Sequence, residues 1–266
     1  MQLQDIYIYP IKSLGGIRLD QWTLEEKGFT HDRRWMLVDM NGGFMSQRTF
    51  PKMALLQVTL EENSLRVIQK NKPDNSIAIP FDYNAVEKME VQIWEDTVEA
   101  QVLEERYGDW FSEFLGIPCK LVSMPESEKR KLKPKYAVNG ESVSFADGMP
   151  YLLIGQEALD ELNSRLEEAV GMERFRPNLV FSGGYAFEED QWDEVKIGDA
   201  EFKITKPCAR CVMTTVDQDT ARKGKEPLRT LASYRTVDNK VMFGQNMLLL
   251  QGKEIRVGDT VVPFKK

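Results

Sequence analysis

The first hundred residues alternate apolar and polar side chains over short runs, and turn-forming residues separate these runs. The alternation is clear in Leu3 to Pro10, in Ala54 to Leu60 and in residues 91–103. Asn41 to Gly43 form a turn signal between two further β-prone runs. Successive side chains of a strand point to opposite faces, so this pattern predicts many short strands. A mainly β fold, built as a sandwich or a barrel, is therefore expected.

Three stretches show helical spacing instead. Apolar residues from Tyr107 to Leu115 recur at helical intervals, and Gly116 follows them as a stop signal. A second stripe, from Leu159 to Val170, predicts a helix that ends before Gly171. A short third helix is expected from Pro227 to Tyr234. Apolar stripes of this kind usually pack into the core rather than form a cofactor site.

The remaining segments fit this mainly β pattern. Residues 195–207 and 253–264 each contain a strand, a Gly-Asp turn and a second strand. Between the first two helices, Pro125 to Glu141 is charged and carries two prolines, which is typical of a domain boundary or a mobile loop. Its basic run, residues 129–135, could guide an anionic partner, although a solvated loop is the commoner meaning of such a run.

Charge and cysteine content narrow the functional classes. The 266 residues carry a net charge of -7, so a nucleic acid polymer is not an expected partner. Three cysteines form no disulfide framework and favour a reducing compartment. The N-terminus has no signal-peptide pattern, and no apolar run of about 18 residues occurs. We therefore expect a cytoplasmic protein, not bound to a membrane and monomeric.

Two of the cysteines lie in the motif PCARC, residues 207–211, which allows four interpretations. A thioredoxin-like dithiol needs a helix N-terminus at the pair, whereas VMTTV after it predicts a strand that runs into an Asp-rich turn. A structural zinc site needs four ligands, and only Cys119 and His31 remain to complete it. A pair of packed thiols leaves the nearby Lys206 and Arg210 unexplained. Positive charge favours a thiolate, which is both a soft metal ligand and a nucleophile.

The surrounding motifs add a resemblance to a known family. KPCARCVMTTVDQDT, with FRPNLVFSGG and WDEVKIGDAEFK before it, resembles the MOSC domain. IYPIKSLGGI, HDRRWMLVD and SQR resemble the β-barrel domain that precedes MOSC in the same group. The resemblance implies two β-barrel domains, an N-terminal one over residues 1–120 and a MOSC domain over residues 121–266. It is strongest to proteins of the amidoxime-reducing type.

The resemblance also implies a molybdenum cofactor, a pterin dithiolene that carries a phosphate; pyridoxal phosphate is not expected. Cys211 matches the cysteine that ligates the metal, and Cys208 matches a neighbouring position. The implied cofactor-binding residues are Lys12, Ser13, Arg33, Asp147, Gly148, Met149, Arg176, Asn178, Ala209 and Arg210. The chain departs from the family at Gly148 and Met149, where relatives have Thr-Ser, so any contact there must come from backbone groups. A second departure, TTVDQDTA in place of TTVDPDTG, bears on substrate preference more than on the metal.

Most of these residues also have plainer interpretations when they are taken singly. Lys12 and Arg33 could be exposed strand-end charges, and Arg176 and Asn178 could serve a salt bridge and a turn. Asp217 and Asp219 are acidic candidates, but turn-forming aspartates are commoner. His31, the only histidine, is a candidate proton shuttle, although an exposed strand histidine is the commoner case. These residues support a shared cofactor site only if they converge on one thiolate.

The resemblance predicts a molybdenum-dependent oxidoreductase that reduces small N-hydroxylated compounds such as amidoximes, hydroxylamines and N-hydroxylated bases. No GxGxxG fingerprint is present, and three cysteines cannot also ligate a four-cysteine iron–sulfur cluster. A separate ferredoxin- or flavoprotein-like electron donor is therefore implied. Two alternatives remain open: a sulfur carrier with a persulfide on Cys211, and a non-enzymatic carrier of the cofactor.

Overall fold

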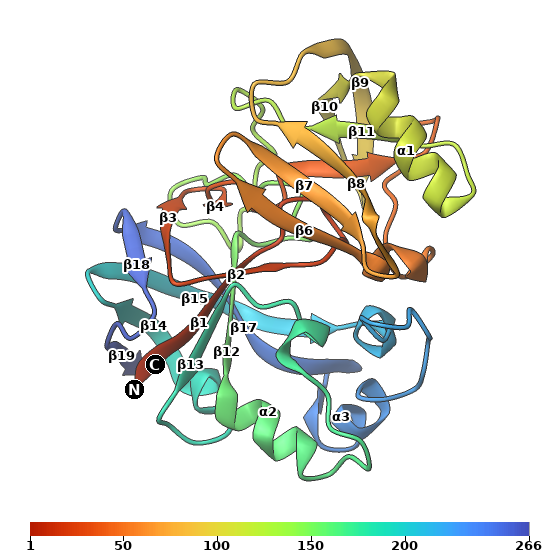
Figure 1. The fold of residues 1–266 in the computed structure, drawn as a ribbon. Coiled ribbons are helices and arrows are strands. Elements are labelled where there is room, and N and C mark those ends of the chain that lie inside the picture. Colours follow the sequence, from red (N-terminus) through yellow and green to blue (C-terminus); the bar gives the residue numbers. More distant parts are fainter. Residues whose placement is uncertain (266) are drawn as a thin grey trace.

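The computed structural model describes residues 1–265, which form two β-rich lobes (Figure 1). The C-terminal lobe is built on a nine-stranded sheet in the order β19-β14-β15-β17-β12-β13-β1-β2, with β16 on the side of β17. β12 and β13 pair in parallel, and the other neighbours are antiparallel. Its strands are β1 (Gln2–Ile8), β2 (Ile17–Leu19), β12 (Tyr151–Gly155), β13 (Leu179–Ser182), β14 (Trp192–Ile197), β15 (Ala200–Arg210), β16 (Thr236–Val237), β17 (Lys240–Gln251) and β19 (Val261–Lys265).

The N-terminal lobe contains two smaller sheets and a helix. A four-stranded sheet has the order β5-β11-β10-β9, and a three-stranded sheet has the order β6-β7-β8. A further small sheet, β18-β3-β4, joins residues from both ends of the chain. The strands of these three sheets are β3 (Gln21–Glu25), β4 (Gly28–Phe29), β5 (Trp35–Val38), β6 (Leu56–Glu61), β7 (Ser64–Gln69), β8 (Lys72–Pro80), β9 (Ala85–Ile93), β10 (Asp96–Leu103), β11 (Lys120–Ser123) and β18 (Glu254–Arg256).

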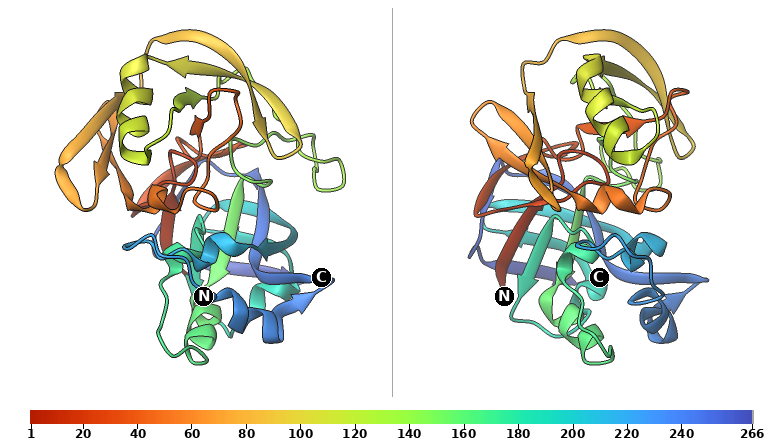
Figure 2. Two further views of the ribbon diagram at one scale, coloured as in Figure 1. Left: turned by 90° about the vertical axis from the view of Figure 1, so that its right-hand side faces the viewer. Right: turned by 45° about the vertical axis from the view of Figure 1, so that its right-hand side comes forward.

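The mainly β class is confirmed. The large sheet has β19 and β2 at the ends of its strand order, but an antiparallel bridge between Gln2 and Thr260 and a hydrogen bond from the Val261 N–H to the Met1 carbonyl also join β1 to the start of β19. The first strand belongs to the sheet of the opposite lobe: Gln2 faces Ser182 and Ile6 faces Leu179 across the β1–β13 pair. Leu3, Ile6 and Ile8 are buried in the same core cluster as Trp192 and Phe202. The sequence division at residue 120 remains a prediction, and in space the first two strands lie with the second half. Figure 2 shows the two lobes from two further sides.

The first predicted helix agrees with the structure and the second is shorter than predicted. α1 (Glu105–Leu115) ends at Gly116, whose φ of 77° suits glycine. α2 (Gln156–Asn163) ends two turns early because the Asn163 side chain both donates to and accepts from the backbone of Val170. Leu166 and Val170 still pack against the buried cluster beside α2. α3 (Leu228–Arg235) begins directly after Pro227, as expected.

Two other expectations need correction. Asn41 to Gly43 do turn the chain, but the two arms are joined only over a short stretch, by the bridge between Val38 and Phe44 and by hydrogen bonds from the Asp39 N–H to Gly43 and from the Met45 N–H to Leu37. The strand predicted from Ala54 begins at Leu56, because residues 51–55 form the 3₁₀ helix η1 (Pro51–Leu55). Among residues 1–265, no helix has the length and apolar character needed to span a bilayer.

The segment from Pro125 to Glu141 is irregular, but it is not simply a solvated loop. Arg130 is 5% exposed and donates to the backbone oxygens of Ser144 at 3.0 Å and Ala146 at 2.5 Å. It also pairs with Asp96 at 2.8 Å. One cation of the basic run therefore anchors the segment that leads to residue 147.

Candidate functional site

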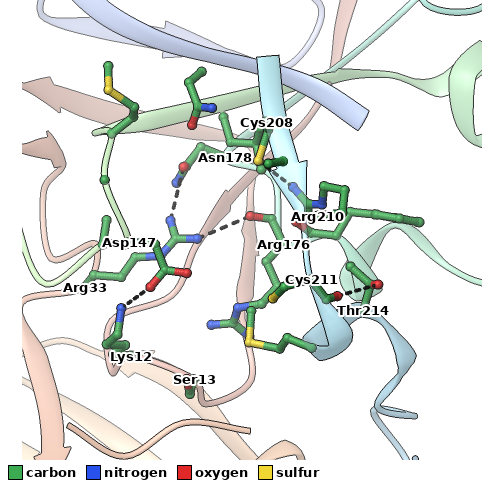
Figure 3. A pocket seen from close by; sticks show the side chains of 18 of the residues that line it. Lys12, Ser13, Arg33, Asp147, Arg176, Asn178, Cys208, Arg210, Cys211 and Thr214 are labelled. Atoms are coloured by element: carbon green, nitrogen blue, oxygen red, sulfur yellow. Dashed lines mark hydrogen bonds and ion pairs between the residues drawn. The ribbon is translucent and has the colours of Figure 1, made fainter. Parts of the chain in front are cut away.

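One pocket gathers the predicted site residues from distant parts of the chain (Figure 3). We call its residues before position 50 the first wall, residues 146–149 the rim, and residues from 175 onward the second wall. Every predicted site residue lines this pocket: Lys12, Ser13 and Arg33 in the first wall, Asp147, Gly148 and Met149 in the rim, and Arg176, Asn178, Ala209, Arg210 and Cys211 in the second wall. The convergence that single residues could not establish is therefore present.

Three of these residues have left-handed backbone conformations. The φ angles are 66° at Ser13, 51° at Arg33 and 53° at Arg176. Such conformations cost free energy in a residue with a side chain, and they persist only where the surroundings impose them. Here Gln47 Nε2 donates to the Ser13 carbonyl at 2.8 Å, and the Arg33 N–H donates to the Tyr9 carbonyl at 3.0 Å. Backbone strain thus coincides with the pocket lining.

Lys12 and Asp147 form an ion pair between the first wall and the rim. Lys12 is 5% exposed, and its Nζ lies 2.5 Å from Asp147 Oδ1 and donates to the Phe145 carbonyl at 2.7 Å. Burial lowers the pKa of Lys12, although Asp147 opposes this effect. Burial would raise the pKa of Asp147, but the charge and hydrogen bond of Lys12 outweigh it and hold that pKa well below its usual range. Asp147 is therefore a carboxylate at neutral pH.

Arg33 is fixed by a carboxylate and an amide. Its Nη1 lies 2.5 Å from Oδ2 of Asp32, which is fully buried, and 3.1 Å from Asn178 Oδ1. Its Nη2 donates to the Arg176 carbonyl at 3.2 Å. Asn178 in turn donates to Asp32 Oδ2 at 3.2 Å and to the Tyr7 carbonyl at 3.1 Å. Asn178 therefore connects the two walls.

Arg176 has donor capacity that the protein does not use. It is 6% exposed, and its Nη1 donates to the Leu14 carbonyl at 2.7 Å. Its Nη2 is buried and has no hydrogen-bond partner among the described residues. Burial lowers the pKa of Arg176 to about 10, which leaves the side chain cationic at neutral pH. A buried, unpaired guanidinium nitrogen at a pocket wall fits an anionic ligand.

Cys211 lies where β15 ends, and here the predicted strand is wrong. Residues 212–215 form the 3₁₀ helix η4 (Val212–Thr215). Both the N–H and the hydroxyl of Thr214 donate to the Cys211 carbonyl, at 3.1 and 3.0 Å. The hydroxyl of Thr215 donates to the Val212 carbonyl at 2.7 Å. β-Branched residues favoured a strand, but their hydroxyls stabilise the tight turn instead.

Each of the paired thiols lies beside its own arginine. Nη1 of Arg210 is 2.9 Å from the sulfur of Cys208, and Nη2 of the same residue donates to the Phe175 carbonyl. Nη1 of Arg48 is 4.0 Å from the sulfur of Cys211. Both cysteines are partly exposed and unbridged. The side chain of Arg210 is therefore turned toward the first cysteine of the motif, while Cys211 is approached from the first wall.

Sequence reasoning missed several residues of the pocket. The most important of these is Arg48, which lies beside the Cys211 sulfur. Its guanidinium carbon stacks 3.9 Å from the centre of the Trp94 ring, and the Trp94 indole N–H donates to Asp147 at 3.2 Å. Arg48 ends the SQR motif, but that motif alone did not indicate a side chain beside the thiol. The other lining residues are Ala146, Leu152, Phe175, Cys208, Met213, Thr214 and Asn246.

The remaining candidates lie outside the pocket. Cys119 is buried beside α1, where the Ser112 hydroxyl accepts from its N–H at 2.9 Å, so the three cysteines do not converge. His31 is half-buried in a turn rather than exposed in a strand, and its ring stacks on Phe81 at 4.3 Å. Asp217 Oδ1 accepts from two N–H groups of its own turn, and Asp219 pairs with Lys70. Residues 1–265 contain no group of three or more His, Cys, Asp or Glu side chains arranged to hold a metal ion.

The donor set fits an anion that also offers metal ligands. Lys12, Arg33 and Arg176 supply cationic donors, and Cys211 supplies one thiol in the same pocket. Lysine and arginine suit phosphate oxygens, and a single thiolate suits a metal whose other ligands come with a cofactor. The residues present therefore fit a phosphate-bearing dithiolene cofactor, with Cys211 and the cationic residues as its proposed ligands.

Comparisons with known proteins agree with this geometry. The family model described as "MOSC N-terminal beta barrel domain" matches residues 1–118, and the one described as "MOSC domain" matches residues 140–262. Mitochondrial amidoxime-reducing component 1 of Mus musculus is 34% identical over 96% of this chain and 80% of its own length. The human protein of that name is 33% identical over 96% and 81%.

Molybdenum cofactor sulfurases are similarly related. The Arabidopsis thaliana sulfurase is 36% identical over 91% of this chain but only 32% of its own length. The chain thus spans about a third of the sulfurases that it matches. A solved structure titled "Crystal structure of YiiM from Geobacillus stearothermophilus" covers 44% of this chain and 55% of its own, at 15% identity and a TM-score of 0.34, and is too distant to add to the argument. Because both family models match in order and the amidoxime-reducing relatives align over almost the whole chain, this chain belongs to the family of MOSC-domain proteins with an N-terminal β-barrel domain.

Proposed function

We propose that this chain is a molybdenum-cofactor-dependent enzyme that reduces small N-hydroxylated compounds. The observation that carries the proposal is the convergence of Cys211 with cationic donors from both halves of the chain in one pocket. The relatives named for amidoxime reduction align over about four-fifths of their length and support this substrate class. The related sulfurases support a link to the same cofactor.

Different pocket residues would bind the anionic end of the cofactor and its metal. Lys12, Ser13, Arg33 and Arg176 would hold its anionic end, and Asn178 keeps Arg33 in place across the walls. The thiolate of Cys211 would ligate the metal, and the Arg48 guanidinium 4.0 Å away partly neutralises the sulfur charge. When bound, the cofactor supplies two-electron redox chemistry at the metal.

Asp147 is the best placed group to contact the substrate. Its side chain is half-exposed at the rim, and Lys12 keeps it ionised. A carboxylate there can accept hydrogen bonds from the N–H groups of an amidoxime and so orient the N–O bond. The overall reaction breaks that N–O bond, consumes two electrons and two protons, and releases the oxygen as water. The electrons would come from a separate donor protein.

The sulfur-carrier alternative rests on the same thiol. The sulfurase relatives are as similar to this chain as the amidoxime-reducing ones, and a partly exposed Cys211 could carry a persulfide. A carrier that only stores or delivers the cofactor would also use this pocket. The three possibilities differ in what the purified protein contains and whether it turns over.

The test measures molybdenum and pterin in protein purified from a host that makes the cofactor. Wild type is compared with Cys211→Ala, and Cys208→Ala serves as the matched control in the same motif. We expect near-stoichiometric molybdenum in wild type, its loss in Cys211→Ala and its retention in the control. Reduction of an amidoxime with a chemical electron donor should follow the molybdenum content.

Other results would favour the alternatives. A cyanide-releasable sulfur on Cys211 without molybdenum would favour the sulfur carrier. Full molybdenum content without reduction of any N-hydroxylated compound would favour the non-enzymatic carrier.

A further inference from the structure

Tyr9, which follows β1, is buried directly behind the cationic side chains of the pocket. It is 2% exposed, and its backbone is fixed by two hydrogen bonds: its N–H donates to Asp32 Oδ1 at 2.7 Å, and its carbonyl accepts from the Arg33 N–H at 3.0 Å. Gly16 leaves room for the ring, since a Cβ at that position would lie 2.4 Å from a ring carbon. The ring has essentially one place to occupy.

Two guanidinium groups share this one ring. The guanidinium carbon of Arg33 lies 4.3 Å from the ring centroid, and that of Arg176 lies 4.1 Å from it. Arginine is attracted to an aromatic face, and the attraction grows when the pair is shielded from water. The Tyr9 hydroxyl is buried and has no hydrogen-bond partner among the described residues. The ring, rather than the hydroxyl, therefore makes the contacts that matter.

The shared ring offsets an electrostatic cost. The positive charge of Arg33 disfavours the charge on Arg176, after burial the second influence that lowers the pKa of Arg176. The fully buried Asp32 pairs with Arg33, but within residues 1–265 Arg176 forms no ion pair with a carboxylate. Both guanidinium groups contact the Tyr9 ring, in addition to the hydrogen bonds that each makes separately.

We propose that Tyr9 is a positioning residue whose ring presents Arg33 and Arg176 to the pocket as one fixed cationic pair for an anionic ligand. The inference rests on the proposed function for the identity of the ligand, the phosphate-bearing end of the cofactor. It extends that function by assigning the geometry of the anion site to a residue that does not line the pocket.

The test separates the ring from the hydroxyl. Tyr9→Phe keeps the ring and removes a hydroxyl without a partner, whereas Tyr9→Leu removes the ring. Inorganic phosphate is titrated into cofactor-free protein by calorimetry, and bound pterin is measured in protein from a cofactor-producing host. We expect Tyr9→Leu to lower phosphate affinity about tenfold, and Tyr9→Phe to remain within about twofold of wild type. Pterin content should follow the same order.

A third variant covers the case in which Tyr9→Leu does not fold. Gly16→Ala keeps the tyrosine but displaces its ring, because the added Cβ would lie 2.4 Å from a ring carbon. This variant should also weaken phosphate binding. Equal affinities for Tyr9→Leu and wild type, equal losses in Tyr9→Phe and Tyr9→Leu, or a wild type without measurable phosphate binding would each overturn the inference. Absence of pterin and molybdenum from wild type would instead count against the proposed function, and the phosphate titration would still decide the role of Tyr9.

Discussion

The two walls of the pocket carry similar positive charge, but they compensate it differently. In the first wall, Lys12 is paired with Asp147 and Arg33 with Asp32. In the second wall, neither Arg176 nor Arg210 has an ion pair with a carboxylate within residues 1–265; Arg176 has a spare buried nitrogen, and Arg210 contacts a thiol and a carbonyl. Arg48, the third cation of the first wall, has no ion pair within residues 1–265 and instead stacks on Trp94 beside Cys211. Two of the three cations in the first wall are thus paired in the free protein, whereas neither arginine of the second wall is. Substitutions in the two walls should therefore have opposite effects on stability.

The largest effect is expected for Arg33→Met. It leaves the fully buried Asp32 without its cationic partner, and breaking a buried ion pair on one side is costly. We expect the free energy of unfolding, measured by urea denaturation of the cofactor-free protein, to fall by about 3 kcal/mol. The double variant Asp32→Asn with Arg33→Met should recover much of the loss. A loss below about 1 kcal/mol would remove the distinction between the walls.

Arg176→Met should act in the other direction. It removes a buried charge that has no carboxylate partner and replaces it with an apolar side chain that can fill the space. Urea denaturation of the cofactor-free protein should show a free energy of unfolding that is unchanged or raised by about 1 kcal/mol. The same variant, purified from a cofactor-producing host, should have lost its bound pterin. If this variant is destabilised as strongly as Arg33→Met, the second wall is not waiting for a ligand.

The dependence of stability on acidic pH tests the ion pair between Lys12 and Asp147 at the rim. The folded-state pKa of Asp147 is lowered, so between the folded and unfolded values the unfolded chain binds more protons. The stability contributed by the pair with Lys12 is therefore present above the unfolded carboxyl pKa, about 4, and is lost as the pH falls below it.

Asp147→Asn should therefore lose stability less steeply than wild type as the pH falls below about 4. Arg176→Met should keep the wild-type slope, because Arg176 has no carboxylate partner. The measurement is the free energy of unfolding at a series of acidic pH values. Parallel acid limbs for Asp147→Asn and wild type would show that the pair with Lys12 does not set this dependence.

The smallest change in stability is expected for substitution of Trp94, which stacks on Arg48 beside Cys211. Trp94 is 45% exposed, so replacing it by Leu removes a solvent-accessible stack on Arg48 and one hydrogen bond to Asp147. The free energy of unfolding should fall by only about 0.5 kcal/mol, and Trp94→Phe, which keeps a ring, should lose less. A loss comparable to that of Arg33→Met would mean that the stack is a main support of the first wall.

The sequence predicted the regular elements well where one local signal determined them. β1 forms where its apolar alternation predicts it, apart from a register shift between Leu3 and Asp5, and α1 ends at its glycine. The residues that line the pocket were implied by the family resemblance and not by a local signal. α2 was predicted too long because apolar spacing does not reveal that an Asn163 side chain will bind the Val170 backbone. The strand after Cys211 was wrong because hydroxyl-to-carbonyl bonds outweighed β-propensity.

The contacts that sequence reasoning missed depend on chain segments far apart. Arg48 reaches Cys211 over 163 positions, and no local pattern marks that approach. Arg130 was assigned to a solvated run because its neighbours are charged, yet carbonyls from residues 144 and 146 draw it inside. Periodicity reports which face of an element is apolar, but not which distant segment will cover it.

The position of β1 has a consequence for how the protein is made. β1 pairs with the nearby β2 on one side but with β13 on the other, where Gln2 faces Ser182, so β1 leaves the ribosome long before this second partner exists. Such long-range pairing slows folding, and until it forms, β1 exposes apolar side chains and an unpaired strand edge. A fragment that begins after residue 120 would in turn leave β13 as an open edge prone to association. The C-terminal lobe is therefore completed by a strand that is synthesised before the whole N-terminal lobe, and that strand stays without its long-range partner until β13 has been translated.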